Sequence, residues 1–236
     1  MSVRRVWITG AGRGIGRAAA ERFAEAGWMV YMSARTESDL EEGAVRCRVA
    51  GPGARVLPLD VRDARAVAAA AAVIEGEGGP PDALFLSAGV GSFGPVAETD
   101  PAEWERILAV NLSGTFHCMR YALPGMIRRG SGKIILVSSI AARIALPGAA
   151  AYSASKAGVQ ALANSAREEL RGTGVRVSVI TAGATASPFW DTVESDLDRN
   201  RMLPPRTVAE AALRLAEEPP EGTTEELVLL PPDGLL

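Results

Sequence analysis

This sequence has little of the chemistry that builds disulfide frameworks or metal centres. Its 236 residues include two cysteines, Cys47 and Cys118, one histidine, His117, and only two lysines, Lys133 and Lys156. Two cysteines cannot form a disulfide framework, and one histidine adds too little to complete a metal-ligand set. We therefore expect no metal ion and a reducing, cytoplasmic location. We expect His117 and Cys118 to pack within a helix rather than to bind a ligand.

Long apolar runs and long runs of like charge are also missing. No apolar stretch approaches the roughly 20 residues that cross a bilayer. The opening segment MSVRRVWITG leads directly into a strand-like run, so we expect neither a membrane span nor a secretion signal. The net charge is −3 and no region calls for nucleic acid or an anionic membrane as a partner.

Strand-like and helix-like runs alternate along the whole chain, with glycine and proline clusters at the joins. This alternation predicts a single α/β domain over residues 1–236. It would be a Rossmann-type, doubly wound parallel sheet of about seven strands with helices on both faces. Strands are expected at 3–9, 28–34, 54–59, 83–86, 134–137, 175–180 and 226–230, and helices at 15–26, 37–50, 64–74, 103–128, from about 152 onward, and 208–217.

A glycine-rich turn joins the first expected strand to the first expected helix. Glycines allow the backbone to turn tightly and to approach a pyrophosphate, and the helix N-terminus supplies N–H donors. A glycine-rich connection without a ligand is the alternative, but a strand before it and a helix after it favour a dinucleotide site. The candidate cofactor-binding residues of this turn are Thr9, Gly10, Gly12, Arg13, Gly14, Ile15 and Gly16.

The second strand ends in Ser33-Ala34-Arg35, without the acidic residue that binds a ribose 2′-hydroxyl. Ala34 leaves room at this position, Arg35 follows it, and Arg13 lies within reach of the same ribose. Two guanidinium groups without a carboxylate favour a 2′-phosphate, and hence NADP(H) over NAD(H). The alternative is that both are solvated surface arginines.

Two further strand ends carry candidate cofactor contacts. Asp60, followed by Val61, is placed to accept a hydrogen bond from an adenine amino group, or alternatively to cap the next helix, a role for which Asp63 competes. The fourth strand ends in Ser87-Ala88-Gly89, whose small side chains let the backbone pass close to a cofactor.

The candidate catalytic residues surround the segment from Ser139 to Lys156. Tyr152 and Lys156 are four residues apart on an expected helix, so their side chains share one face. An ammonium beside the phenol is expected to lower the tyrosine pKa towards the working range. Ser139 follows a buried strand and offers a hydroxyl in the same crevice. A surface Tyr/Lys pair is the alternative. Asn111, inside an apolar helix, is either a structural hydrogen-bond node or part of a polar relay.

Together these residues resemble the short-chain dehydrogenase/reductase family, in its compact one-domain form. The resemblance covers essentially the whole chain. It implies that Tyr152 is the general acid/base and that Ser139 holds the carbonyl or hydroxyl oxygen. It implies that Lys156 lowers the tyrosine pKa and binds the nicotinamide ribose, and that Asn111 fixes a water connecting Lys156 to solvent. It also implies that Asp60 and Val61 contact adenine.

The sequence departs from the family pattern at three places. The family's Asn-Asn-Ala-Gly is Leu86-Ser-Ala-Gly89 here, so Ser87 must do a structural job usually given to an amide. After the sixth strand the family's Pro-Gly is Ala182-Gly183, and Ser187 stands where a threonine usually meets the nicotinamide carboxamide. The C-terminus, 229–236, lacks the glycine-rich segment that packs across a subunit interface in many members of the family. This counts against the family's usual homotetramer, so either a homodimer or a homotetramer is expected.

These residues predict an NADP(H)-dependent oxidoreductase that transfers hydride between nicotinamide and a carbonyl or alcohol carbon. The alternatives are a non-catalytic dinucleotide sensor on the same fold and an epimerase or dehydratase of the extended branch of the superfamily. The extended branch usually has a longer C-terminal domain and a different glycine spacing.

A small, mostly apolar substrate is expected. The segment 187–205 is predicted to form a lid whose apolar residues either line the pocket or pack the lid onto the body. Arg143 is the one charged candidate for a substrate contact, unless it is solvated. The candidate lining residues are Phe189, Trp190, Met202 and Leu203 of the lid, with Phe93, Ile144 and Leu146.

Overall fold

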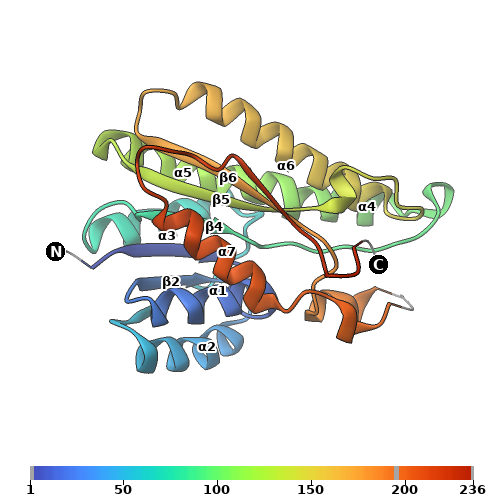
Figure 1. Cartoon of the computed structure of the whole chain (residues 1–236), viewed down its shortest axis with the longest axis horizontal. Helices are drawn as coiled ribbons and strands as arrows, with labels where there is room; N and C mark the ends of the chain where they lie inside the picture. Colours follow the sequence, from blue (N-terminus) through green and yellow to red (C-terminus); the bar gives the residue numbers. More distant parts are fainter. Residues whose placement is uncertain (1–2, 194–196, 235–236) are drawn as a thin grey trace.

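The computed structural model describes residues 3–193 and 197–234, which form one parallel sheet with helices on both sides (Figure 1). The predicted fold class is confirmed. The seven strands are β1 (Arg5–Thr9), β2 (Met29–Ser33), β3 (Ala54–Val56), β4 (Ala83–Leu86), β5 (Gly132–Ser139), β6 (Val175–Ala182) and β7 (Glu226–Leu229).

The strand order is β3-β2-β1-β4-β5-β6-β7, and every neighbouring pair is parallel. The chain adds β2 and β3 on one side of β1 and then crosses back to add β4 on the other side. The connections that follow β1 and β4 therefore lead to helices on opposite faces of the sheet. Open α/β sheets bind ligands in the crevice at such a point.

Successive residues of β1 face opposite sides of the sheet, and both sides are buried. Val6 and Ile8 belong to one apolar core, whereas Trp7 between them belongs to the other. This period of two explains the continuous apolar character of the central strands. The sheet is thus sealed on both faces.

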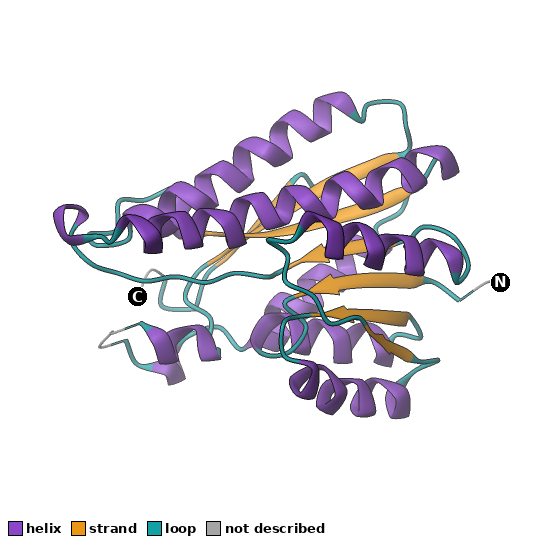
Figure 2. Cartoon of the chain, turned by 180° about the vertical axis from the view of Figure 1, so that it is seen from behind, coloured by secondary structure: helices purple, strands orange, loops and turns teal. Residues whose placement is uncertain are grey.

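The first core is covered by α1 (Gly14–Glu25), α2 (Glu37–Ala50) and α7 (Pro205–Glu217), and the second by α3 (Ala64–Gly76), α5 (Gly114–Arg129) and α6 (Ala150–Glu169). Figure 2 shows the second layer from its own side. The short helix α4 (Pro101–Leu108) precedes α5 and packs near α6.

The long helix expected at 103–128 is interrupted. Between α4 and α5 the backbone forms a π-helical segment, Ala109–Ser113, with Asn111 at its centre. A π segment has a wider turn than an α-helix and shifts the register of the residues after it. Apolar periodicity does not reveal this, because the helix axis continues and Asn111 stays buried.

Some expected boundaries also differ by a few residues. β3 ends at Val56 rather than at residue 59, and the chain then runs along the sheet edge through backbone bonds from Leu57 to Met32 and from Leu59 to Ala34. α7 begins at Pro205, whose fixed φ suits the first turn of a helix.

Candidate active site

A cavity of about 570 Å³ lies at the carboxyl ends of the strands. Of the predicted site residues, only Thr9 and Asn111 do not line it; both are buried behind its wall. The structure thus brings together residues that are far apart in the sequence. The predicted residues that line the cavity are Gly10, Gly12, Arg13, Gly14, Ile15, Gly16, Ala34, Arg35, Asp60, Val61, Ser87, Ala88, Gly89, Ser139, Tyr152, Lys156, Gly183 and Ser187.

The glycine turn between β1 and α1 forms one wall. Gly10 and Gly14 have positive φ angles of 69° and 56°, which L side chains rarely adopt. A Cβ atom on Gly16 would lie 2.2 Å from the carbonyl oxygen of Gly10, so no side chain fits where α1 begins. The first turn of α1 carries no acidic residue, and Arg13 at its N-cap makes no side-chain capping hydrogen bond. These free N–H groups and the helix dipole fit a phosphate of a dinucleotide.

Ser87 has a structural role in this wall, as its departure from the family pattern predicts. Its hydroxyl donates a hydrogen bond of 2.7 Å to the carbonyl oxygen of Thr9 and so ties the end of β4 to the end of β1. A Cβ atom on Gly10 would lie 2.8 Å from the backbone nitrogen of Ala88. The two loops therefore touch, and small residues are needed on both.

The far end of the cavity, beyond β2 and β3, is charged. Arg13 and Arg35 are exposed at its rim. Asp60 lines it and is held by Arg62, whose guanidinium donates to both carboxylate oxygens at 2.7–3.1 Å. These hydrogen bonds keep the pKa of Asp60 below its ordinary value. Asp63, not Asp60, caps α3, which removes the capping alternative for Asp60.

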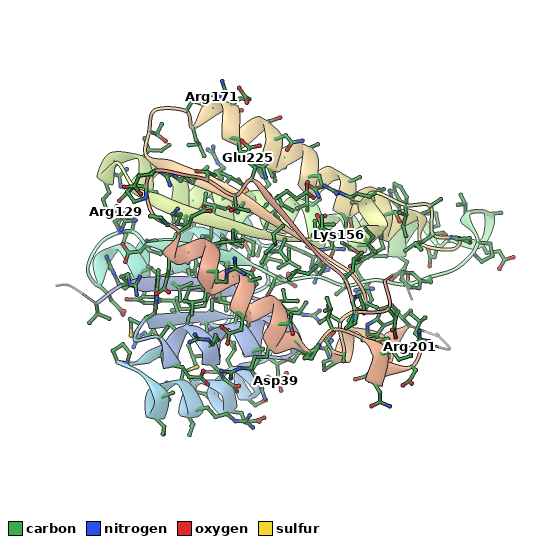
Figure 3. The ribbon with its side chains drawn as sticks, in the orientation of Figure 1. Asp39, Arg129, Lys156, Arg171, Arg201 and Glu225 are labelled. Carbon is green, nitrogen blue, oxygen red and sulfur yellow. The ribbon has the colours of Figure 1, made fainter. Side chains whose placement is uncertain are left out.

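Three predicted catalytic side chains meet at the other end. Ser139 ends β5, and its side chain lies near enough to the hydroxyl of Tyr152 to lower the pKa of that phenol. The ammonium of Lys156 lies 5.7 Å from the centroid of the Tyr152 ring and donates 2.9 Å to the carbonyl oxygen of Val137. Figure 3 shows Lys156 beneath α6. One hydroxyl, one phenol and one buried amine thus surround a space that can hold a carbonyl oxygen.

The expected lowering of the tyrosine pKa is not found. Removal of water around the phenol raises the pKa of Tyr152, and the hydrogen bond from Ser139 opposes this only in part. Burial lowers the pKa of Lys156 to about 8. The spacing of four residues brings the two groups together, but removal of water around each group moves its pKa in the direction that favours its neutral form.

The side chain of Asn111 makes the hydrogen bonds expected of a structural node. Its side-chain oxygen accepts from the backbone nitrogen of Val90 at 2.9 Å, and its amide group donates to the oxygen of Val90 and to Ser155 Oγ, each at 2.9 Å. The hydroxyl of Ser155 donates to the carbonyl oxygen of Tyr152 at 2.7 Å. Asn111 therefore connects the loop after β4 to the helix that carries Tyr152.

The space next to Tyr152 is walled by aromatic rings. The Phe189 ring centroid lies 5.3 Å from that of Tyr152, and Phe93 lies 6.1 Å from Tyr152 and 6.3 Å from Trp190. Ile144 and Leu146 line the same region. The predicted lining role of Phe189, Trp190, Phe93, Ile144 and Leu146 thus agrees with the geometry.

Other lid and loop residues have packing roles. Met202 and Leu203 are 5% exposed and do not line the cavity, so they hold the lid on the body. Backbone bonds from Ala186 to Leu203 and from Leu203 to Ala184 close the base of the lid. Arg143 makes an ion pair with Glu226 and is neither a lining residue nor merely solvated.

The two predicted residues at the start of the lid approach other parts of the wall. Gly183 donates a backbone hydrogen bond to Leu229 at 2.7 Å, and a Cβ atom on it would lie 3.0 Å from Pro231. Ser187 faces Gly14, with its Cβ 3.2 Å from the place of a Cβ on that glycine. Ser187 thus lies beside the phosphate-binding turn.

One charged residue of the cavity, Asp39, is not among the residues that the sequence predicts. It lies in the first turn of α2, five residues beyond Ala34, and it lines the same charged end. The available signal was its position just after the second strand, four residues beyond Arg35. The strand end itself, Ser33-Ala34-Arg35, has no carboxylate, as expected from the sequence, but the next helix supplies one.

Metal ligands and membrane-spanning helices were also sought in the described residues. In the described ranges no cluster of three or more metal-ligating side chains occurs. None of the helices there has the length and apolar character to span a bilayer. His117 Nδ1 lies 3.0 Å from the carbonyl oxygen of Val61, and Cys118 is buried, so both pack within α5 as expected.

Known proteins share this fold and much of the sequence. A family model described as short chain dehydrogenase matches residues 4–198. Sepiapterin reductase of Chlorobaculum tepidum is 31% identical over 234 residues, which cover 96% of this chain and 96% of that protein. A short-chain reductase, NovJ, of Streptomyces niveus is 35% identical over 231 residues, covering 97% of this chain and 88% of that protein.

A solved structure with the same arrangement contains a nicotinamide cofactor. A metagenomic short-chain oxidoreductase in complex with NADP has a TM-score of 0.86 and 33% sequence identity, and the match covers 97% of this chain and 96% of that chain. Since the family model and these relatives span nearly its whole length, the chain belongs to the short-chain dehydrogenase/reductase family, whose oxidoreductases act on CH–OH and C=O groups with a nicotinamide dinucleotide.

Proposed function

We propose that this chain is an NADP(H)-dependent oxidoreductase that transfers hydride between nicotinamide and the carbonyl or alcohol carbon of a small, mostly apolar substrate. The observation that carries the proposal is the joint placement of Ser139, Tyr152 and Lys156 at one end of the cavity whose other end is formed by the glycine turn. A dinucleotide has the length to connect a phosphate site with a catalytic centre of this kind.

Each residue has a separate task in this proposal. The bound dinucleotide supplies or accepts the hydride at the substrate carbon. In reduction, the hydroxyl of Tyr152 gives its proton to the carbonyl oxygen, and in oxidation its phenolate takes the alcohol proton. Ser139, next to Tyr152, donates to the same substrate oxygen and positions it. Lys156, with a pKa of about 8, is a source of the replacement proton at neutral pH.

The charged rim of the cavity supports NADP(H) as the cofactor. Arg13 and Arg35 are exposed at the end where the ribose of the adenosine half would lie, and Ala34 leaves space between them. Guanidinium groups bind phosphate with charge-assisted hydrogen bonds. These two side chains support a preference for NADP(H).

The substrate end supports an apolar compound. Its walls are the rings of Phe93, Phe189 and Trp190 with Ile144 and Leu146. In the described part of the chain, the other charged residues that line the cavity stand at the adenosine end, and only Lys156 lies near Tyr152. A cationic substrate would therefore lose its hydration without gaining an ionic partner, and an anionic one would meet only Lys156, whose amine already donates to Val137.

Tyr152→Phe tests this function. NADPH and NADH oxidation is measured with a panel of aldehydes, ketones and diketones, and Tyr121→Phe, which removes a hydroxyl from a tyrosine outside the cavity, is the matched control. We expect Tyr152→Phe to lose at least about 10²-fold of turnover and to retain cofactor binding. Equal activity of both variants would contradict the role of Tyr152. Tight NADPH binding without turnover on any compound would favour the non-catalytic sensor instead.

We also propose a cytoplasmic homo-oligomer, either a dimer or a tetramer. Phe116 and Ile127 expose 46% and 42% of their surface on α5, and their separation of eleven residues places them on one helix face. Exposed apolar side chains on one face favour association. Light scattering checks this, because a mass of one chain, 24.6 kDa, would contradict it.

A further inference from the structure

A carboxylate stands at the cavity end where two arginines favour a phosphate. Asp39 lines the cavity and is half-buried in the first turn of α2. Its Cβ lies 3.2 Å, and the Cβ of Ala34 lies 3.3 Å, from the place that a Cβ on Gly12 would occupy. Asp39 therefore reaches the space that the small side chain of Ala34 leaves open beside the glycine turn. In Figure 3, Asp39 lies near α2, well below Lys156.

The backbone holds Asp39 in this position. Its carbonyl oxygen accepts a hydrogen bond of 2.6 Å from Arg17, which also makes an ion pair of 2.9 Å with Glu42. α1 and α2 are thereby clamped together, and the first turn of α2 stays against the glycine turn. The carboxylate does not depend on a flexible loop for its placement.

The carboxylate of Asp39 has no side-chain partner among the described residues. Its carboxylate makes no ion pair and no hydrogen bond with any residue in the ranges 3–193 and 197–234. Asp60, the other carboxylate of the cavity, is held by Arg62 through several hydrogen bonds. The charge of Asp39 is therefore available to a ligand at this end.

We propose that Asp39 is a specificity residue that limits the preference for NADP(H). This inference rests on the proposed function. A carboxylate beside the adenosine ribose accepts hydrogen bonds from the ribose hydroxyls of NAD(H) and repels the 2′-phosphate of NADP(H). Arg13 and Arg35 attract the same phosphate. The site thus holds opposing determinants and accepts both cofactors, with Asp39 on the side of NAD(H).

The test compares dinucleotide binding to Asp39→Asn with binding to the wild-type chain. Glu37→Gln is the matched control, because Glu37 lies in the same helical turn, is exposed and does not line the cavity. Dissociation constants are measured calorimetrically for NADP⁺ and NAD⁺, and for adenosine 2′,5′-bisphosphate and ADP as minimal probes. Removing one partly exposed charge beside a bound phosphate changes the affinity for that phosphate by about three- to tenfold.

We expect Asp39→Asn to bind NADP⁺ and adenosine 2′,5′-bisphosphate about three- to tenfold more tightly, and to bind NAD⁺ no more tightly than the wild-type chain. Glu37→Gln should change neither the ratio of the dissociation constants of NADP⁺ and NAD⁺ nor that of the two minimal probes. Equal ratios in the wild-type chain and Asp39→Asn, or an equal change in the control, would overturn the inference and leave the proposed function intact. Absence of binding of both dinucleotides to the wild-type chain would overturn both. Asp39→Ser provides the same charge change if the asparagine variant does not fold.

Discussion

Asn111→Ala separates the structural role of this side chain from a role in proton relay. Asn111 is fully buried and makes three side-chain hydrogen bonds, two to the backbone of Val90 and one to Ser155. At about 1 kcal/mol for each bond, their loss costs about 3 kcal/mol of the free energy of unfolding. For a chain of this length, about 2–4 °C of melting temperature is lost per kcal/mol. We expect the melting temperature to fall by about 6–12 °C.

The assay is thermal and urea unfolding of the variant, followed by cofactor titration below its melting temperature. Asn164→Ala is the matched control. Asn164 is exposed on α6 and accepts a single hydrogen bond of 2.6 Å from Arg167, so its replacement should change stability by less than about 0.5 kcal/mol. Asn111→Asp adds a second measurement, because it keeps an acceptor for Val90 but loses both donated bonds.

One pattern of results would refute the structural reasoning. If Asn111→Ala melted within about 2 °C of the wild-type chain but lost turnover, the hydrogen bonds to Val90 and Ser155 would not support the fold. The relay would then explain the need for an asparagine. A lower melting temperature with normal turnover of the remaining folded chain would support the node.

Two further predictions concern charge. Arg35→Ala should weaken binding of NADPH by about 1.5–3 kcal/mol, the value of a charge-assisted hydrogen bond, and leave NADH binding nearly unchanged; calorimetric titration measures both, and equal losses would refute the 2′-phosphate contact. Burial lowers the pKa of Lys156 from 10.5 to about 8, so the unfolded chain binds more protons between these values and the free energy of unfolding rises with pH across that window. Lys156→Met should remove this rise, which urea unfolding at several pH values between about 8 and 10 will detect; an unchanged slope would contradict the lowered pKa.

The fold could be predicted because its signals are local. Alternation of apolar runs and glycine-rich joins indicates a parallel sheet, and the strand from Lys133 onward is apolar enough to be buried on both faces. The strand order and the π segment around Asn111 could not be predicted, because they depend on contacts between distant parts of the chain. They depend on which strands pair and on how Asn111 bonds to Val90 and Ser155, residues at a distance of 21 and 44 positions in the chain.

The site residues also fall into those that local spacing predicts and those that only the packing of the fold brings to the cavity. The glycine turn, Ser139, Tyr152 and Lys156 follow from spacing along single elements, and the cavity brings them together as expected. Asp39 does not follow from spacing. Its carboxylate comes from the first turn of the next helix, and only the packing of α2 against Gly12 places it at the cavity.

The pKa values of Tyr152 and Lys156 depend on burial in the folded chain, which the spacing of residues does not reveal. Four residues of helix place Lys156 near Tyr152, which by itself predicts a lowered tyrosine pKa. The structure buries both groups, so the pKa of Tyr152 rises and that of Lys156 falls to about 8. A phenol with a raised pKa stays protonated at neutral pH and can donate to a carbonyl oxygen, whereas alcohol oxidation needs the phenolate. Carbonyl reduction should therefore be favoured at neutral pH, and alcohol oxidation should accelerate as the pH rises.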